Sequence, residues 1–319
     1  MKRNIKIILL TVIVILVLAI FCNYSIKSKN KENDKLNIVV TTFSAYDFTR
    51  QIVGDKANVT FLLGPGVDAH SFEPTANDLS KIQSSDVFIY IGGEMEKWTD
   101  KILGTDIISN KTKLIKISDA IDTIKEQEVD GTEEEVDEDE EFEGAFDEHI
   151  WTSPANSIKM MYYLNKTISN IDEKNSNFYS ENTEKYVEQI KDVQKKIADI
   201  VASKKRDRLV FGDKMPMQYF LNEYGLKASA ALKGCSTESD ASAKTIAYLI
   251  DKVREEKIPV VLYIELSNGK TAETIAKETG AKNMQIQTLH NISKEDFENG
   301  ETWVSLMTKN LDVLKKALD

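Results

Sequence analysis

The sequence predicts an α/β protein of two lobes, each built on a parallel β-sheet, with a long helix joining them. Short β-rich runs alternate with helical runs from residue 36 onward, which is typical of parallel βαβ units. The alternation occurs twice, before and after a long helical stretch. The length of 319 residues allows about two domains, and a hydrophobic content of 41% provides apolar surface for a core in each.

Residues 36–172 are expected to form the first lobe. Its predicted strands are Leu36–Thr41, Asn58–Leu63, Asp86–Ile91 and Lys113–Ile117. The helices predicted between and after these strands are Ala45–Val53, Thr75–Gln83 and Glu94–Leu103. Later in this lobe, Pro154 follows Ser153 and favours the start of another helix, towards Ser169.

Residues 173–205 are expected to form the joining helix. From Glu181 to Lys204 the chain contains no Gly or Pro. Apolar side chains recur there at steps of three and four, at Tyr186, Ile190, Val193, Ile197 and Ile200. This spacing gives one apolar stripe. A helix of this length is more than about 30 Å long, so it can lie along both lobes and restrain their opening.

Residues 206–319 are expected to form the second lobe. Its predicted strands are Arg208–Phe211, Lys227–Leu232, Pro259–Ile264 and Asn283–Gln287. Its predicted helices are Met217–Tyr224, Ala241–Glu256, Lys270–Thr279 and Trp303–Leu318.

The N-terminus has the pattern of an export signal. Lys2, Arg3 and Lys6 precede an uncharged, largely aliphatic run that ends at Cys22. Cys22 has the position of the lipid-bearing cysteine of bacterial lipoproteins, so residues 1–22 are predicted to be a signal and lipid anchor and residues 23–35 a tether. An uncleaved anchor is the alternative, because Phe21 is bulky for that cleavage site. Either way, the body is expected on the outer face of the cell membrane.

The net charge of −11 is concentrated in one segment. Residues 126–148 contain fourteen acidic side chains and no basic one, and without this segment and the basic N-terminus the formal charges cancel. A nucleic-acid binder needs a basic face, and this charge balance disfavours that class. The acidic loop, residues 126–146, is interpreted as a solvated loop, which is compatible with a role in collecting cations.

The chain has only three histidines, His70, His149 and His290. His70 lies in a turn-rich loop after a predicted strand, His149 lies just before a helix start, and His290 follows the last predicted strand. Ligands of open α/β sheets collect beyond the carboxyl ends of strands, and neutral imidazole is a good zinc ligand. The three side chains are therefore candidate ligands of one metal site between the lobes.

Longer motifs surround two of these histidines. Residues 66–78, Gly-Val-Asp-Ala-His-Ser-Phe-Glu-Pro-Thr-Ala-Asn-Asp, and residues 84–98, which end in Gly-Gly-Glu-Met-Glu-Lys-Trp, resemble the zinc/manganese solute-binding proteins of ABC transporters. Residues 148–154, Glu-His-Ile-Trp-Thr-Ser-Pro, resemble that family's second histidine motif, and residues 263–267 and 274–282 resemble its C-terminal lobe.

The resemblance covers about residues 36–319. It implies two Rossmann-like lobes with a divalent cation bound in the cleft between them. It also implies a monomeric extracytoplasmic receptor that delivers Zn²⁺, or alternatively Mn²⁺, to a membrane permease with its ATPase.

The sequence departs from the family pattern at two ligand positions. The family's usual histidine early in the second lobe is replaced in the stretch Val210–Lys214, at Gly212, and its usual aspartate is absent from Ile286–Asn291. We infer that His290 replaces one of them. Glu265, Asp213 and a water are the candidates for the fourth position, with Glu265 favoured.

Other residues near the expected site have alternative roles. Residues 234–240 are interpreted as a helix-entry turn, while Cys235 or Glu238 is the alternative as a metal ligand. Trp151, two residues from His149, is expected to exclude water.

Two other classes of function compete with transport. A zinc hydrolase with Glu265 as general base is disfavoured, because the chain has no His-Glu-x-x-His, Gly-x-Ser-x-Gly or phosphate-loop motif. A surface adhesion protein with a structural metal site is the remaining alternative.

Overall fold

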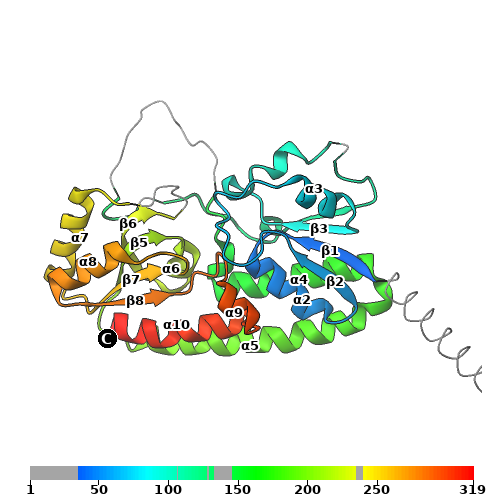
Figure 1. Ribbon diagram of the computed structural model, residues 1–319. Coiled ribbons are helices and arrows are strands. Elements are labelled where there is room, and N and C mark those ends of the chain that lie inside the picture. Colours follow the sequence, from blue (N-terminus) through cyan, green and yellow to red (C-terminus); the bar gives the residue numbers. More distant parts are fainter. Residues whose placement is uncertain (1–34, 106, 128, 133–145, 235–239) are drawn as a thin grey trace, which may run out of the picture.

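The computed structural model describes residues 35–105, 107–127, 129–132, 146–234 and 240–319. It contains two four-stranded sheets side by side (Figure 1). The first has the order β2-β1-β3-β4 and the second β6-β5-β7-β8, and every strand pair is parallel. The strands are β1 Leu36–Val40, β2 Ala57–Phe61, β3 Val87–Tyr90, β4 Lys113–Lys116, β5 Arg208–Met215, β6 Lys227–Lys233, β7 Val260–Ile264 and β8 Lys282–Ile286. The predicted two-lobe α/β fold is confirmed.

The helix α5, Ser176–Ala202, runs along both lobes (Figure 1). Its 27 residues give a length of about 40 Å. Its buried positions include Tyr186, Ile190, Val193 and Ile197, so the apolar stripe read from the sequence is its packed face. The helix begins and ends within the predicted range of residues 173–205. It packs on α2 (Phe43–Val53), α4 (Pro154–Ile171) and α10 (Trp303–Leu318).

A buried carboxylate connects three of these helices. Asp47 on α2 is fully buried. Its Oδ2 accepts hydrogen bonds from the Tyr186 hydroxyl on α5 (2.6 Å) and from the backbone N–H of Trp303 at the start of α10 (2.8 Å). Arg50 pairs with Oδ1 at 2.8 Å. Because α2 belongs to the first lobe and α10 to the second, Asp47 ties the lobes together.

The remaining helices largely follow the sequence pattern. The α-helices are α3 Ala76–Gln83, α6 Gln218–Tyr224, α7 Ala243–Glu255, α8 Lys270–Thr279 and α9 Lys294–Glu298. The short 3₁₀ turns are η1 Glu94–Glu96, η2 Thr99–Lys101, η3 Ile117–Ala120, η4 Ile150–Thr152 and η5 Glu173–Asn175. The sequence prediction did not include α9, and it ended β5 four residues early, at Phe211.

The predicted helix Glu94–Leu103 is wrong: the segment forms the two turns η1 and η2. Carboxylates hold the backbone here in place of a continuous helix. Glu96 Oε2 accepts from the N–H groups of Ile91 and Gly92, both at 2.7 Å, and Glu148 Oε1 accepts from the N–H of Met95 at 2.7 Å.

Several predictions fall on residues outside those described. They concern the signal and anchor, Cys22, most of the tether, most of the acidic loop, Cys235 and Glu238. Among the described residues, no helix has the length and apolar character needed to cross a membrane.

Candidate metal centre

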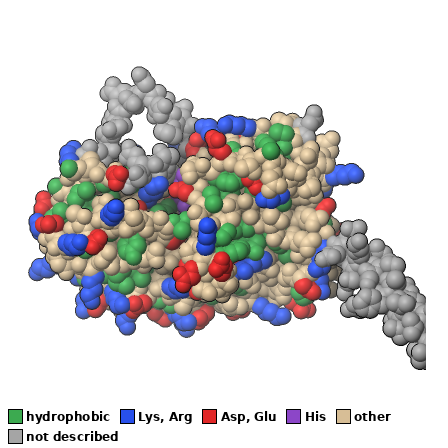
Figure 2. Space-filling model, in the orientation of Figure 1, with side chains coloured by type: hydrophobic (Ala, Val, Ile, Leu, Met, Phe, Trp, Pro, Cys, Tyr) green, Lys and Arg blue, Asp and Glu red, His purple; other side chains and the backbone are tan. Residues whose placement is uncertain are grey.

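The three histidines lie together between the lobes. His70 follows β2, His149 precedes η4 and His290 follows β8. One potential ligand atom from each lies within 4.8 Å of those of the other two. Figure 2 shows only a trace of histidine surface, between the two halves of the molecule. Side chains far apart in the sequence therefore form a single cluster of imidazoles.

The loops that carry His70 and His290 are hydrogen-bonded to each other. The N–H of Gly66 donates to the carbonyl of Ile292 at 2.8 Å, and the Asn291 side chain donates to the carbonyl of Val67. Leu289, just before His290, has a positive φ of 61°. Such a backbone is unfavourable for a branched side chain, so the loop contacts must hold it.

Asp147 orients His149. Its Oδ1 accepts a hydrogen bond from the His149 backbone N–H at 2.9 Å and lies 2.8 Å from Nδ1 of the ring. With a proton on Nδ1, the lone pair is on Nε2. A carboxylate behind a histidine is a common way to fix a metal ligand.

Two ring nitrogens in the cluster have no hydrogen-bond partner among the described residues. They are Nε2 of His70 and Nε2 of His149, and both are buried. A buried polar atom without a partner is costly. A cation at the centre of the cluster would accept both lone pairs.

The pKa values of the histidines differ because of their surroundings. Burial and the charge of His149 lower the pKa of His70 to about 4. Burial, His70 and His149 hold the pKa of His290 well below its ordinary value. Burial also acts to lower the pKa of His149, but the charge and hydrogen bond of Asp147 outweigh it and raise that pKa. His70 and His290 are thus neutral at physiological pH and available as ligands.

Glu265 lies beside the cluster but outside the set of adjacent ligand atoms. Its Oε2 accepts from the N–H of Thr288 at 2.7 Å, and its Oε1 accepts from the Thr288 hydroxyl at 2.7 Å and the His290 N–H at 3.1 Å. Burial raises its pKa. In this arrangement, Glu265 fixes the loop that carries His290.

Trp151 is fully buried against the cluster. Its ring is nearly parallel to that of His290, with centroids 6.1 Å apart and an interplanar angle of 9°. Its Nε1–H donates to the carbonyl of Thr288 at 3.0 Å. The indole therefore covers one side of the imidazoles, and the exclusion of water by Trp151 stays a prediction.

Gly212 faces the helix α8 closely. A Cβ on Gly212 would lie 2.4 Å from Cα of Ala272, so no side chain fits there and this position cannot supply a ligand. Asp213 accepts hydrogen bonds from the N–H groups of Lys214 (Oδ1, 2.8 Å) and Ile264 (Oδ2, 3.4 Å).

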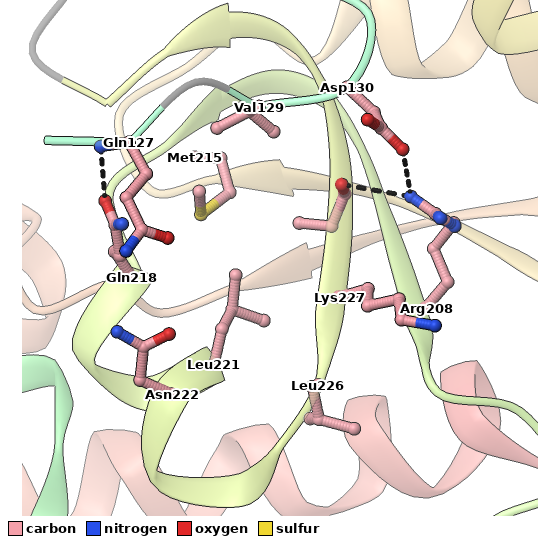
Figure 3. Close-up of a pocket in the computed structure, with 11 residues that line it drawn as sticks. Gln127, Val129, Asp130, Arg208, Met215, Gln218, Leu221, Asn222, Leu226 and Lys227 are labelled. Atoms are coloured by element: carbon pink, nitrogen blue, oxygen red, sulfur yellow. Dashed lines mark hydrogen bonds and ion pairs between the residues drawn. The ribbon is translucent and has the colours of Figure 1, made fainter.

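Two cavities differ in chemistry. One, of about 300 Å³, is lined by residues that include His70, Asp213, Lys214, Glu265 and His290. The other, of about 280 Å³, lies in the second lobe under the start of the acidic loop (Figure 3). No histidine lines the second cavity.

The start of the acidic loop packs on the second lobe. The N–H of Gln127 donates to Gln218 Oε1 at 3.1 Å, and Asp130 pairs with Arg208 at 2.7 Å (Figure 3). Backbone and side-chain bonds therefore anchor this part of the loop, while Glu126, Gln127 and Asp130 are exposed to solvent, as expected of a solvated loop. Residues 133–145 lie outside the described residues.

Sequence reasoning did not single out Asp147 or Met95. Asp147 had a signal, since it lies two residues before His149. Met95 had none: its sulfur reaches His290 only through the meeting of the lobes, across 195 positions.

Comparisons with known proteins all point to one protein family. Residues 38–317 match the family described as zinc-uptake complex component A, periplasmic. The zinc-binding lipoprotein AdcA of Streptococcus pneumoniae is 34% identical over 296 residues, which are 92% of this chain and 58% of AdcA. The high-affinity zinc uptake system protein ZnuA of Bacillus subtilis is 31% identical over 298 residues, 91% of this chain and 90% of that protein.

A solved structure supports the same likeness. The crystal structure of the Zn(II)-bound ZnuA-like domain of Streptococcus pneumoniae AdcA superimposes with a TM-score of 0.74 at 32% identity. It covers 89% of this chain and 99% of that domain. The chain thus spans somewhat more than half of the full-length AdcA and nearly all of its ZnuA-like domain.

Proposed function

The chain belongs to the periplasmic zinc-uptake component A family, and on that premise we propose that it is the extracytoplasmic solute-binding component of a metal ABC importer. It captures Zn²⁺ and delivers it to a membrane permease with its ATPase. The observation that carries this proposal is the cluster of three imidazoles drawn from both lobes, two of which have buried nitrogens without a described partner.

His70, His149 and His290 are the proposed ligands. His290 takes the place of one of the two usual ligands that the second lobe lacks. Three nitrogen donors favour zinc over manganese, which prefers more oxygen ligands. A water completes the tetrahedron, with Glu265 as the protein alternative. Ligation by Glu265 would break its hydrogen bonds to the loop after β8, which favours the water.

The protein acts without chemical turnover on its ligand. Residues 1–22 serve as signal and lipid anchor through Cys22, residues 23–35 as a tether, and the protein works as a monomer outside the membrane. The ties through Asp47 and α5 favour a restrained opening of the lobes at 36–172 and 206–319 over a wide one.

Elemental analysis tests this function. The full-length protein, in mild detergent, is equilibrated with equimolar zinc, manganese and iron and then freed of unbound metal. We expect about one zinc per chain in the wild type and a large loss in His290→Ala. Asn299→Ala, a substitution at the exposed end of α9, is the control. Retention of manganese, absence of metal, or unchanged zinc in His290→Ala would contradict the proposal.

A further inference from the structure

We propose that the histidine cluster also binds a soft monovalent cation, copper(I), with the thioether sulfur of Met95 as an additional ligand. This inference rests on the proposed metal site. It adds a second class of cation and a ligand to that site.

Met95 Sδ lies 3.2 Å from Nε2 of His290. The side chain is 3% exposed. Its backbone N–H donates to Glu148 Oε1 at 2.7 Å, and Glu148 directly precedes His149. The sulfur of the first lobe is thus held against the histidine of the second, beside the histidine cluster.

The separation of the two atoms suits a shared cation. Consider a cation about 2.1 Å from the nitrogen and about 2.3 Å from the sulfur. When these two donor atoms are 3.2 Å apart, the nitrogen–cation–sulfur angle is roughly 95°. Widening the separation to about 3.6 Å gives a tetrahedral angle. A thioether has rotatable bonds enough for such a small shift.

The donor set favours a soft ion. Three imidazoles and a thioether contain no carboxylate, and the nearby carboxylates of Glu148 and Glu265 accept backbone hydrogen bonds instead. Thioether sulfur is a ligand that selects Cu(I), while carboxylate and water suit harder ions.

Charge points in the same direction. The four donors carry no charge when they bind a cation, and the Asp147 carboxylate behind His149 supplies one negative charge. A buried zinc ion therefore leaves a net positive charge in the site, whereas copper(I) is balanced. The cost of burying an ion rises steeply with its charge. The cation of Lys214 lines the same cavity and forms no ion pair with any described residue. It therefore adds to the penalty for a divalent ion.

An anaerobic competition titration tests the proposal. Full-length protein carrying Cys22→Ser and Cys235→Ser, to remove thiols that bind copper(I), is titrated against bathocuproine disulfonate. Met95→Leu in this background is the test variant, because leucine keeps the volume and removes the sulfur. Met307→Leu is the matched control: Met307 is fully buried on α10, and its sulfur accepts a hydrogen bond from Asn310.

We expect one copper(I) per chain, displaced by zinc in excess. Met95→Leu should lower copper(I) affinity at least tenfold and zinc affinity less than threefold, whereas Met307→Leu should change neither. X-ray absorption of the copper(I) form should show a sulfur neighbour that Met95→Leu removes.

Three outcomes would overturn the proposal. Met95→Leu could bind copper(I) as tightly as its parent, or the copper(I) form of the parent could show no sulfur neighbour. Met95→Leu could also lose copper(I) and zinc affinity equally, which would mean that Met95 contributes only through packing. Failure of the proposed zinc function is distinguishable. In that case the wild type would hold copper(I) through sulfur and retain no zinc.

Discussion

The Asp147→Asn substitution is expected to weaken zinc binding and to change how that binding depends on pH. Asp147 is almost fully buried and lies 2.8 Å from Nδ1 of His149. An asparagine can still accept one hydrogen bond there, but it carries no charge. The His149 ring therefore keeps its orientation and becomes a weaker electron donor.

The size of the effect follows from the position behind a ligand. Loss of such a partner lowers metal affinity by about 10- to 100-fold, which corresponds to about 1.4–2.7 kcal/mol. This is the loss expected at a pH where His149 is neutral in both proteins.

The pH dependence has a definite sign. In the wild type, Asp147 raises the pKa of His149 above its ordinary value of 6.5, so zinc must displace a proton as the pH falls through that raised pKa. The variant lacks this charge, and its His149 stays neutral to lower pH. The affinity ratio of wild type to variant should therefore be largest in alkaline solution and narrow as the solution becomes acidic.

Competition with a fluorescent zinc chelator, at several pH values on both sides of 6.5, measures the ratio. Asp172→Asn is the control, since Asp172 is also a buried carboxylate and accepts from the Tyr179 hydroxyl at 2.6 Å, away from the histidines. Equal affinities of variant and wild type, or a ratio that does not change with pH, would refute the reasoning.

Three further predictions concern stability. Chelation of all metal should leave the far-ultraviolet circular dichroism spectrum unchanged. Zinc at about 100-fold its Kd should add about 2.7 kcal/mol to the free energy of unfolding. Loss of the fold on chelation would indicate a structural metal instead. Asp47→Ala should lower the free energy of unfolding in urea by about 3 kcal/mol, because it leaves the buried Tyr186 hydroxyl and Trp303 N–H without their partner and the half-buried Arg50 without its ion pair. A change below about 0.5 kcal/mol would show that these bonds contribute little. Gly212→Ala should cost about 1–3 kcal/mol through its clash with α8, and an unchanged melting temperature would contradict the close packing described.

The sequence allowed the fold to be predicted where one pattern dominated. The stripe of α5 was clear because no Gly or Pro interrupted it, and the strands β3 and β7 were clear because they are continuous apolar runs. The segment Glu94–Leu103 failed for a tertiary reason. Its backbone N–H of Met95 is bound by Glu148, more than 50 residues later, and local propensity contains no information on that bond.

The candidate site could likewise be predicted in part from the sequence. Three histidines in the whole chain, each near a predicted strand or helix end, were enough to propose a cluster. The role of Glu265 could not be predicted from the sequence, because its carboxylate could equally bind a cation or accept hydrogen bonds from the backbone. The structure directs it to Thr288 and His290. Position 212 was read from the family pattern alone, and only the approach of α8 shows that it has no room for a ligand.

The tie between Asp47 and Trp303 has a consequence for biogenesis. A chain is synthesised, and exported through a membrane, from its N-terminus onward. His70 and His149 emerge long before His290, and the partner that fixes Asp47 emerges later still, at the start of the last helix. The Trp303 indole also donates to the carbonyl of Trp151, which covers the histidines. With the export proposed above, the proposed ion site would be completed only after nearly the whole polypeptide had crossed the membrane. The part of the chain still in the cytoplasm would then hold no complete metal site.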